Sequence, residues 1–409
     1  MSCGSDPPKP DAPSHAGWLN RTVLAIGLAS LFSDIGHEMA TAAMPALLAS
    51  FGAAPAVLGL IEGLADGLSS FAKLYSGLYS DRLKRRKPLA VAGYFVTASA
   101  MASFALATQW WHVLVGRVAG WIGRGARSPV KNVLLSDATT PESYGRAFGL
   151  ERAMDSAGAV VGPLLALLLL PLLGFRGLFL CTLIPGILAA VLIAVMVQEK
   201  PHAPRKKARL FAMIRELPKP FVEYLAGVGV AGLGDFSNTL LIMWATLAWA
   251  PHYGEATAAT MGIAFYIFYN VVYTISCSIS GWLADRYPKH WVLSIGYSLA
   301  VIPAVALMWP GESLLKFAIA FGFSGLYMGV WETLENSTAA TLLPSDVRGT
   351  GFGVLATVNG VGDVLSSVLV AFLWQFVSPV AAMSFVIVAA MVGAVIIACA
   401  GMAGAKAPS

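Results

Sequence analysis

Charged residues are scarce in this sequence. Only 12% of its 409 residues are Asp, Glu, Lys or Arg, whereas 57% are apolar. A soluble domain carries about 25% charged residues, so the composition excludes one and indicates a polytopic membrane protein. Cysteine is scarce too. Cys3, Cys181, Cys277 and Cys399 lie far apart without a CxxC pair, which indicates neither a disulfide framework nor a thiolate metal site.

The sequence also lacks the usual catalytic motifs. His37-Glu38 has no second histidine at the spacing of a zinc peptidase helix, and there is no Walker loop, GxSxG elbow or dinucleotide fingerprint. We therefore expect no enzyme, no cofactor and no resident metal. The net charge of +5 comes from short loops between apolar runs, so it does not indicate a nucleic-acid partner. Residues 1–20 lack the apolar segment of a cleavable signal peptide.

Long apolar runs are what the sequence does contain. A helix needs about 20 apolar residues to cross a bilayer, and these runs predict an all-α membrane protein with twelve transmembrane helices. Loops after even-numbered spans carry the Lys and Arg residues. The positive-inside rule therefore predicts a multi-pass protein of the inner membrane with both termini cytoplasmic. The predicted spans are 22–50, 55–79, 88–108, 110–135, 145–171, 175–198, 220–250, 257–284, 290–309, 312–342, 349–377 and 379–403.

The two halves of the chain repeat each other. Two glycine motifs recur about 200 residues further on, and the polar segment at Asp34 recurs more loosely at Asp235. The repeats predict two pseudo-symmetric six-helix bundles, with a substrate site at their interface. The motif pairs are Gly77 to Arg82 with Gly281 to Arg286, and Gly145 to Gly149 with Gly349 to Gly353; the bundles are 22–198 and 220–403, the linker is 199–219, and the tails are 1–21 and 404–409.

One of these motifs resembles a known signature. Gly77-x-x-x-Asp81-Arg82-x-x-Arg85-Arg86 is similar to the loop between the second and third spans of the major facilitator superfamily. The resemblance implies the fold of that superfamily and a gating latch between its halves. Asp81 can accept charge-assisted hydrogen bonds at the N-terminus of a neighbouring helix. The gating candidates in these loops are Gly77, Asp81, Arg82, Arg85, Arg86, Gly281, Asp285 and Arg286.

Two further motifs resemble the same family. The segment from Arg117 to Gly125, with its Arg124, resembles a membrane-embedded Arg–Gly motif that is often linked to proton coupling. The segment Gly158-x-x-x-Gly162-Pro163 resembles a motif of the family's antiporters, which implies export. The glycines would also permit close helix packing by themselves, and the proline would bend its helix. We include Gly158, Gly162 and Pro163 among the gating candidates.

A cluster of ionisable residues lies within the first apolar run. Asp34, His37 and Glu38 are three or four residues apart, so they lie close together on one helix surface. A charged group at mid-bilayer costs roughly 2.5–3.5 kcal/mol. The cluster therefore indicates a polar cavity, a proton path or a bound ion. The alternative is a hydrogen-bonded network that only locks helices together.

Other spans contain ionisable residues as well. Arg124, Arg127 and Lys131 form one stripe of the fourth span, although the last two could instead reach the interface by snorkelling. Buried guanidinium groups need anionic partners, which the fifth and first spans could supply. The candidates for binding substrate or protons are Asp34, His37, Glu38, Arg117, Arg124, Arg127, Asp155, Asp235, Asn238, Glu332, Glu335 and Asp363.

These features favour a proton-coupled antiporter that exports a small cationic solute by alternating access and works as a monomer. Its expected partners are the solute, protons and the lipid bilayer. One alternative is a divalent metal exporter with Asp34, His37 and Glu38 as ligands. Another is a proton symporter that takes up an anionic solute at Arg124 and Arg127. A third is a non-transporting receptor of the same fold.

Overall fold

The computed structural model describes residues 18–53, 55–199, 214–235 and 238–404, and within them it contains helices but no strand. The predicted all-α fold is therefore confirmed. The first bundle comprises α1 (Arg21–Ser50), α2 (Pro55–Ser80), α3 (Lys87–Ala102), η1 (Ser103–Leu106), α4 (Trp110–Asp137), η2 (Pro141–Ser143), α5 (Tyr144–Cys181) and α6 (Leu183–Met196). The second comprises α8 (Lys219–Gly232), α9 (Asn238–Tyr253), α10 (Glu255–Arg286), α11 (Lys289–Ser298), α12 (Val301–Met308), α13 (Leu314–Leu342), α14 (Arg348–Phe376) and α15 (Pro379–Gly404).

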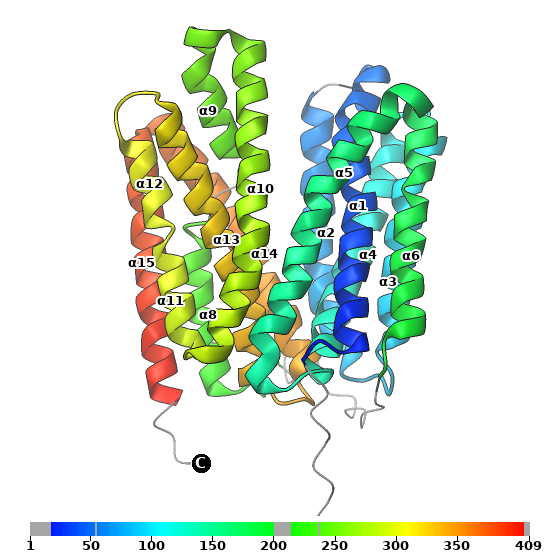
Figure 1. The fold of residues 1–409 in the computed structure, drawn as a ribbon, viewed down its shortest axis with the longest axis vertical. Helices are drawn as coiled ribbons and strands as arrows, with labels where there is room; N and C mark the ends of the chain where they lie inside the picture. The colour runs from blue at the N-terminus through cyan, green and yellow to red at the C-terminus, as the bar shows by residue number, and fades with distance from the viewer. Residues whose placement is uncertain (1–17, 54, 200–213, 236–237, 405–409) are drawn as a thin grey trace, which may run out of the picture.

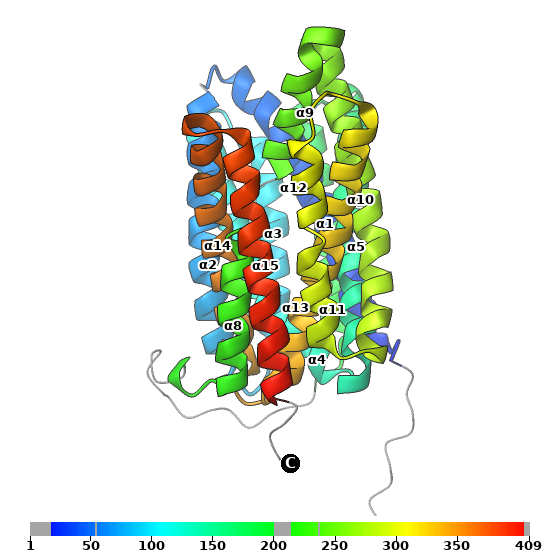
Figure 2. The same ribbon diagram turned by 90° about the vertical axis from the view of Figure 1, so that its left-hand side faces the viewer.

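The two bundles stand side by side with their helices roughly parallel to one long axis (Figure 1). A view from the side shows α8 and α15 beside each other on the outer face of the second bundle (Figure 2). Eight helical stretches of the described residues are long and apolar enough to cross a membrane, judged by length and composition. Many large apolar side chains on the outside are exposed, such as Leu172 at 78% and Ile184 at 70%, as a lipid-facing surface requires.

Several predicted spans are interrupted in the structure. The predicted span 220–250 is two helices, α8 and α9, and the predicted span 290–309 is also two, α11 and α12. Gly232 and Gly234 lie at the first interruption, where their low helix propensity favours a break. The fifth and sixth predicted spans meet at Gly174, whose φ of 63° reverses the direction of the chain inside α5. Counted in this way, the helices account for all twelve spans.

The carboxylate of Asp81 joins the first bundle to the second. It accepts hydrogen bonds from the backbone nitrogens of Gly349 at 3.0 Å and Thr350 at 2.7 Å, and from the Thr350 hydroxyl at 2.7 Å. Burial raises the pKa of Asp81, while the bonds from Thr350 oppose that rise. A Cβ at Gly77 would lie 3.0 Å from the Cα of Gly353, so glycine permits this approach of α2 and α14. Asp81 therefore caps the N-terminus of α14.

The repeated motif makes the same contact in the opposite direction. Asp285 accepts hydrogen bonds from the backbone nitrogens of Gly145 at 2.8 Å and Arg146 at 3.1 Å, and from Nε of Arg146 at 2.6 Å. A Cβ at Gly281 would lie 3.2 Å from the Cα of Gly149. The two aspartates thus cap α14 and α5 at one end of the molecule, which we call the latch end.

Polar side chains fill the space between these two caps. Asn132 of α4 donates a hydrogen bond to Asn336 of α13 at 2.8 Å. Asp137 accepts from Arg348 of the other bundle at 2.8 Å and from Arg86 at 3.1 Å. Arg86 also lies 3.1 Å from Asp81, so the basic loop and both bundles share one ionic network.

The other arginines of these loops lie in different surroundings. Arg85 is exposed and Arg82 is half-buried in the turn after α2. The guanidinium of Arg286 lies over the ring of Trp282, 3.9 Å from its centroid. Arg86 contacts both bundles, since it also donates to the backbone carbonyl of Ser345 in the second bundle at 3.5 Å.

The close approach at Gly77 generates a prediction. Gly77→Val places two methyl groups against the backbone of α14, so the latch end should open. Spin labels on Cys at Arg85 and Asp346, in a background without the native cysteines, should then show a shift to longer distances. The matched control is Gly63→Val on the same helix, because a Cβ there meets no atom within 4 Å. Equal label distances in the two variants would contradict this account of the latch.

Candidate functional site

A chain of alternating charges connects α1 to α13. Arg124 donates to Asp34 at 2.6 and 3.4 Å and lies 3.9 Å from Asp155. Arg152 lies 3.4 Å from Asp155 and 3.6 Å from Glu332 of the second bundle. Tyr273 of α10 donates a hydrogen bond to Glu332. We call these five ionic residues, Asp34, Arg124, Asp155, Arg152 and Glu332, the charge chain.

Glycines of α5 bring α1 close to the charge chain. A Cβ at Gly158 would lie 2.8 Å from the Cβ of Asp34, and one at Gly162 would lie 2.7 Å from the Cβ of Glu38. Small residues four apart thus let the two helices meet at the positions of the α1 carboxylates. Pro163 follows directly inside α5. The fifth-span motif therefore positions the acids of α1, in addition to any role in gating.

Glu38 is the carboxylate of α1 that remains accessible to a ligand or a proton. Its side chain is 27% exposed, and within the described ranges its nearest ionic partner is His37 at 4.0 Å. The His37 side chain is only 2% exposed, and its ring packs in a T-shaped arrangement with the ring of Trp121, 5.4 Å between centroids. Asp34, by contrast, is bound by Arg124. The predicted cluster therefore separates into one paired acid, one packed imidazole and one accessible acid.

The basic residues of α4 also separate. Arg124 is 23% exposed, whereas Arg127 is buried with its guanidinium 3.9 Å from the ring centroid of Tyr94 on α3. Lys131 lies 2.5 Å from Glu151 and 3.2 Å from Ser30, inside the first bundle. Snorkelling of Arg127 and Lys131 is thus wrong, because each of them is buried against a neighbouring helix.

Arg117 lies apart from the charge chain. It forms an ion pair with Glu62 of α2 at 3.0 Å and donates to the Thr41 hydroxyl at 2.8 Å. The ring of Trp121 lies between the two arginines of the motif, 5.3 Å from Arg117 and 5.7 Å from Arg124. Arg117 and Arg124 thus pair with different carboxylates, and both lie against the indole ring of Trp121.

The acids of the second bundle occupy three different places. Glu335 is enclosed, since it accepts from Asn359 at 2.6 Å and also from Tyr297 and Trp331. Asp235 lines a small cavity at the break between α8 and α9. Asp363 lines a larger cavity between α2 and α14. The side chain of Asn238 lies outside the part of the chain that the structure describes.

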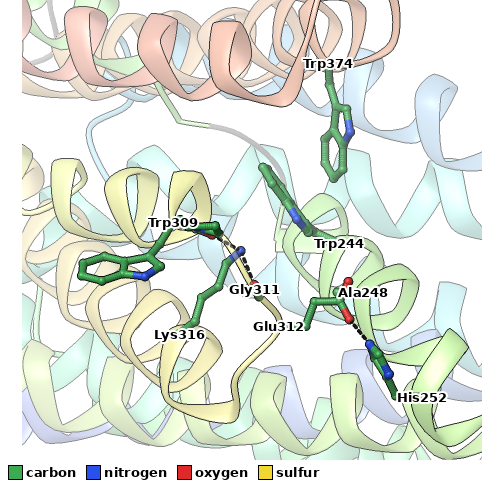
Figure 3. A pocket seen from close by; sticks show the side chains of 9 residues that line it. Trp244, Ala248, His252, Trp309, Gly311, Glu312, Lys316 and Trp374 are labelled. Atoms are coloured by element: carbon green, nitrogen blue, oxygen red, sulfur yellow. Dashed lines mark hydrogen bonds and ion pairs between the residues drawn. The ribbon is translucent and has the colours of Figure 1, made fainter.

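A further cavity of about 610 Å³ lies between α9, α14 and the loop before α13. Figure 3 shows Trp244 and Trp374 facing each other and His252 paired with Glu312 at 2.6 Å. Lys316 donates to the carbonyls of Trp309 and Gly311 and so holds the loop. No group of three or more His, Cys, Asp or Glu among the described residues could hold a metal ion, here or elsewhere.

Comparison with known proteins agrees with this architecture. The family model described as Major Facilitator Superfamily matches residues 26–367. The chain belongs to the Major Facilitator Superfamily. It is therefore a multi-pass membrane transporter of small molecules and not an enzyme. The resemblance that the motifs indicated is confirmed.

Individual superfamily members show the extent of the similarity. An uncharacterised MFS-type transporter of Methanocaldococcus jannaschii is 27% identical over 88% of this chain and 90% of its own. The 4-hydroxybenzoate transporter PcaK of Pseudomonas putida is 24% identical over 87% and 88%. The multidrug resistance protein MdtH of Photorhabdus laumondii is 33% identical, over 26% of this chain and 27% of its own. The superfamily transporter FucP, solved in the outward conformation, covers 96% of this chain and 100% of its own with a TM-score of 0.74 at 16% identity.

Sequence reasoning missed several ionic residues at the site. Glu62, Asp66 and Lys73 are four and seven residues apart, which places them on one side of α2. This helical spacing could have identified the three residues as one polar face of α2. Glu151 and Arg152 are adjacent and lie 3.6 Å from each other, yet Glu151 also binds Lys131 while Arg152 reaches Asp155 and Glu332. Only the packing of four helices around them reveals that division.

The Lys131–Glu151 pair generates a stability prediction. Lys131→Met removes the closest cation from Glu151, whose side chain is 1% exposed, and should cost about 3 kcal/mol of stability. The apparent melting temperature of the purified protein in detergent should fall by several degrees. The control is Lys219→Met, because that lysine is 89% exposed and pairs with Glu223 at 3.7 Å. Similar melting temperatures for both variants would refute a structural role for the buried pair.

Proposed function

We propose that this transporter is a proton-coupled antiporter that exports a small cationic solute by alternating access. The observation that carries the proposal is a surplus of acid around the charge chain. Glu38 and the charge chain together supply four carboxylates and two guanidinium groups. The buried guanidinium of Arg127, which acts on both Asp34 and Asp155, offsets one of the two surplus negative charges. One positive charge is therefore still needed for neutrality in an apolar surrounding, and a proton or a cation can supply it. The carboxylates are Asp34, Glu38, Asp155 and Glu332; the guanidinium groups are Arg124 and Arg152.

In this mechanism protons and the solute compete for the same carboxylates. A cation that binds at Glu38 and Asp34 displaces their protons, and protons that bind from the other side displace the cation. Arg124 can exchange between Asp34 and Asp155, since it already lies within 3.9 Å of both. Each exchange leaves the site neutral, which permits the two bundles to rearrange without a charge exposed to lipid.

The orientation follows from the basic loops. The positive-inside rule places the latch end, with Arg82, Arg85 and Arg86, in the cytoplasm of a cell with an inner membrane. The caps at Asp81 and Asp285 then close the cytoplasmic side, so this conformation faces outward. Export requires both caps to open, and one chain with both bundles is sufficient for that movement. We therefore propose a monomer as the working unit.

The alternatives have less support from the arrangement of the residues. Metal export would need ligands from Asp34, His37 and Glu38, but Arg124 binds the first and the second is packed against Trp121. The relative PcaK is named for transport of 4-hydroxybenzoate, an aromatic anion, which favours an anionic solute. An anion would have to displace carboxylates from Arg124, because Arg127 is turned toward Tyr94. A receptor without transport predicts no flux at all.

Proton flux in everted vesicles tests the proposal. The vesicles are acidified inside and monitored with a pH-quenched dye. They are then challenged separately with organic cations, with Ni²⁺, Co²⁺, Fe²⁺ and Zn²⁺, and with 4-hydroxybenzoate. We expect organic cations to release protons, and Asp34→Asn to lower the initial rate at least about tenfold, since an exchange carboxylate is lost. The matched control is Glu223→Gln, a half-exposed acid of α8 near the linker.

Three results would redirect the proposal. Release only by the divalent metals would replace the organic cation with a metal. A response only to 4-hydroxybenzoate would replace cation export with anion transport. No response to any of these solutes, with normal membrane insertion, would overturn cation antiport.

A further inference from the structure

Arg127 differs from the other cations of α4, because none of the described carboxylates forms an ion pair with it. Its side chain is 3% exposed, and its Nε and Nη1 atoms are buried without a hydrogen-bond partner among the described residues. Arg117, Arg124 and Lys131 each contact a carboxylate at 3.0 Å or less. A buried cation without such a contact is costly, so its presence calls for a reason beyond packing.

An aromatic ring fixes the position of this guanidinium. Its central carbon lies 3.9 Å from the ring centroid of Tyr94 on α3, within the range of a cation–π interaction. A Cβ at Gly93 would lie 2.7 Å from the Cβ of Arg127, so the glycine gives the arginine stem room between α3 and α4. A tyrosine ring attracts a cation but carries no net charge. Tyr94 therefore holds Arg127 and leaves its positive charge uncancelled.

This positive charge acts on the charge chain without contacting it. Arg127 exerts an electrostatic effect on both Asp34 and Asp155. Such an effect extends over several ångströms in a buried site, since neither water nor salt screens it well. Lys131 also acts on Asp155, but Glu151 lies 2.5 Å from it and offsets its charge. Arg127 thus supplies the charge chain with a positive charge that no described acid offsets by contact.

The charge balance of the site depends on Arg127. Glu38 and the charge chain leave two surplus negative charges, and Arg127 reduces them to one. A single proton or a monovalent cation then restores neutrality, whereas a divalent cation leaves a positive charge in an apolar surrounding. Without Arg127 the surplus would be two, which two protons or one divalent cation would match. Charges farther away contribute equally in both cases, so the difference remains one unit.

We propose that Arg127 is a specificity-determining residue that limits the transported solute to one positive charge and the exchange to one proton. It acts through its charge, without contact with the solute. This inference rests on the proposed export of a cation and specifies the charge of that cation. An exchange of one monovalent cation for one proton moves no net charge across the membrane.

Binding of two cations tests the proposal. Methylphenylpyridinium has one positive charge, and methyl viologen is a dication of nearly the same size and shape. Their affinities are measured with radiolabelled compounds on the full-length protein in lipid nanodiscs, without a proton gradient. The unmodified protein should bind the monocation about tenfold more tightly, and Arg127→Gln should shift the affinity ratio about tenfold toward the dication. Arg127→Lys retains the charge and should retain the preference.

The matched control is Arg176→Gln, because Arg176 is an exposed arginine after the bend at Gly174 in the same bundle. This variant should bind both cations as the unmodified protein does. Arg127→Gln deprives no acid of a contact partner, so its melting temperature in detergent should stay close to that of the unmodified protein. An unchanged affinity ratio in Arg127→Gln, or an equal shift in Arg127→Lys, would overturn the proposal.

A measurement without any solute separates this inference from the proposed export. At neutral pH, Arg127→Gln should hold one more protonated carboxyl group than the unmodified protein and Arg176→Gln, which would strengthen the carboxylic-acid band of its infrared spectrum. Equal bands in the three proteins would overturn the role of Arg127 in the charge balance. Failure of both cations to bind would count against cation export, while the infrared band would still decide the role of Arg127.

Discussion

An ionised side chain in an apolar interior needs a partner of opposite charge, and this constraint organises the first bundle. Arg124 is the clearest case, because its guanidinium lies between Asp34 of α1 and Asp155 of α5. Lys131 needs a partner in the same way about two turns further along α4, and Glu151 provides it. Arg124 and Lys131 thus fix the positions of α1, α4 and α5 relative to one another along the helix axes. Where the supply of acids exceeds the supply of cations, at Glu38, the molecule retains an affinity for positive charge.

Glycine provides the second condition, since ionic contacts of this kind need helices that lie unusually close. Gly158 and Gly162 let α1 and α5 meet at the level of the acids, and Gly77 and Gly281 let the bundles meet at the latch end. Helices in lipid associate through packing of small residues rather than through exclusion of water. The same residue type therefore builds both the permanent contact inside a bundle and the contact that has to open between bundles.

Much of the fold could be predicted from the sequence, because apolar length and loop charge are local properties. The repeated motifs also contain Asp81 and Asp285, which join the two bundles in the structure, and their roles in gating stay a prediction. The directions in which buried side chains point were the property that the sequence predicted least well. The sequence spacing places Arg127 on the same helix face as Arg124. In the structure, however, a cation–aromatic contact with Tyr94 directs the Arg127 side chain away from the charge chain. The break between α8 and α9 was missed because Gly232, Gly234 and Asp235, which mark it, interrupt a long and otherwise mostly apolar run only briefly.

The hydrogen bond between Asn132 and Asn336 has a consequence for the origin of the interface. The register that aligns Gly77 with Gly281 and Gly145 with Gly349 also aligns these two asparagines. Each therefore meets its own counterpart, as a residue on a two-fold axis does in a homodimer. An amide suits such a position because it carries both a donor and an acceptor and can pair with an identical group. A single half-length chain could have made this contact with a second copy of itself, so the geometry of closure does not depend on the linker.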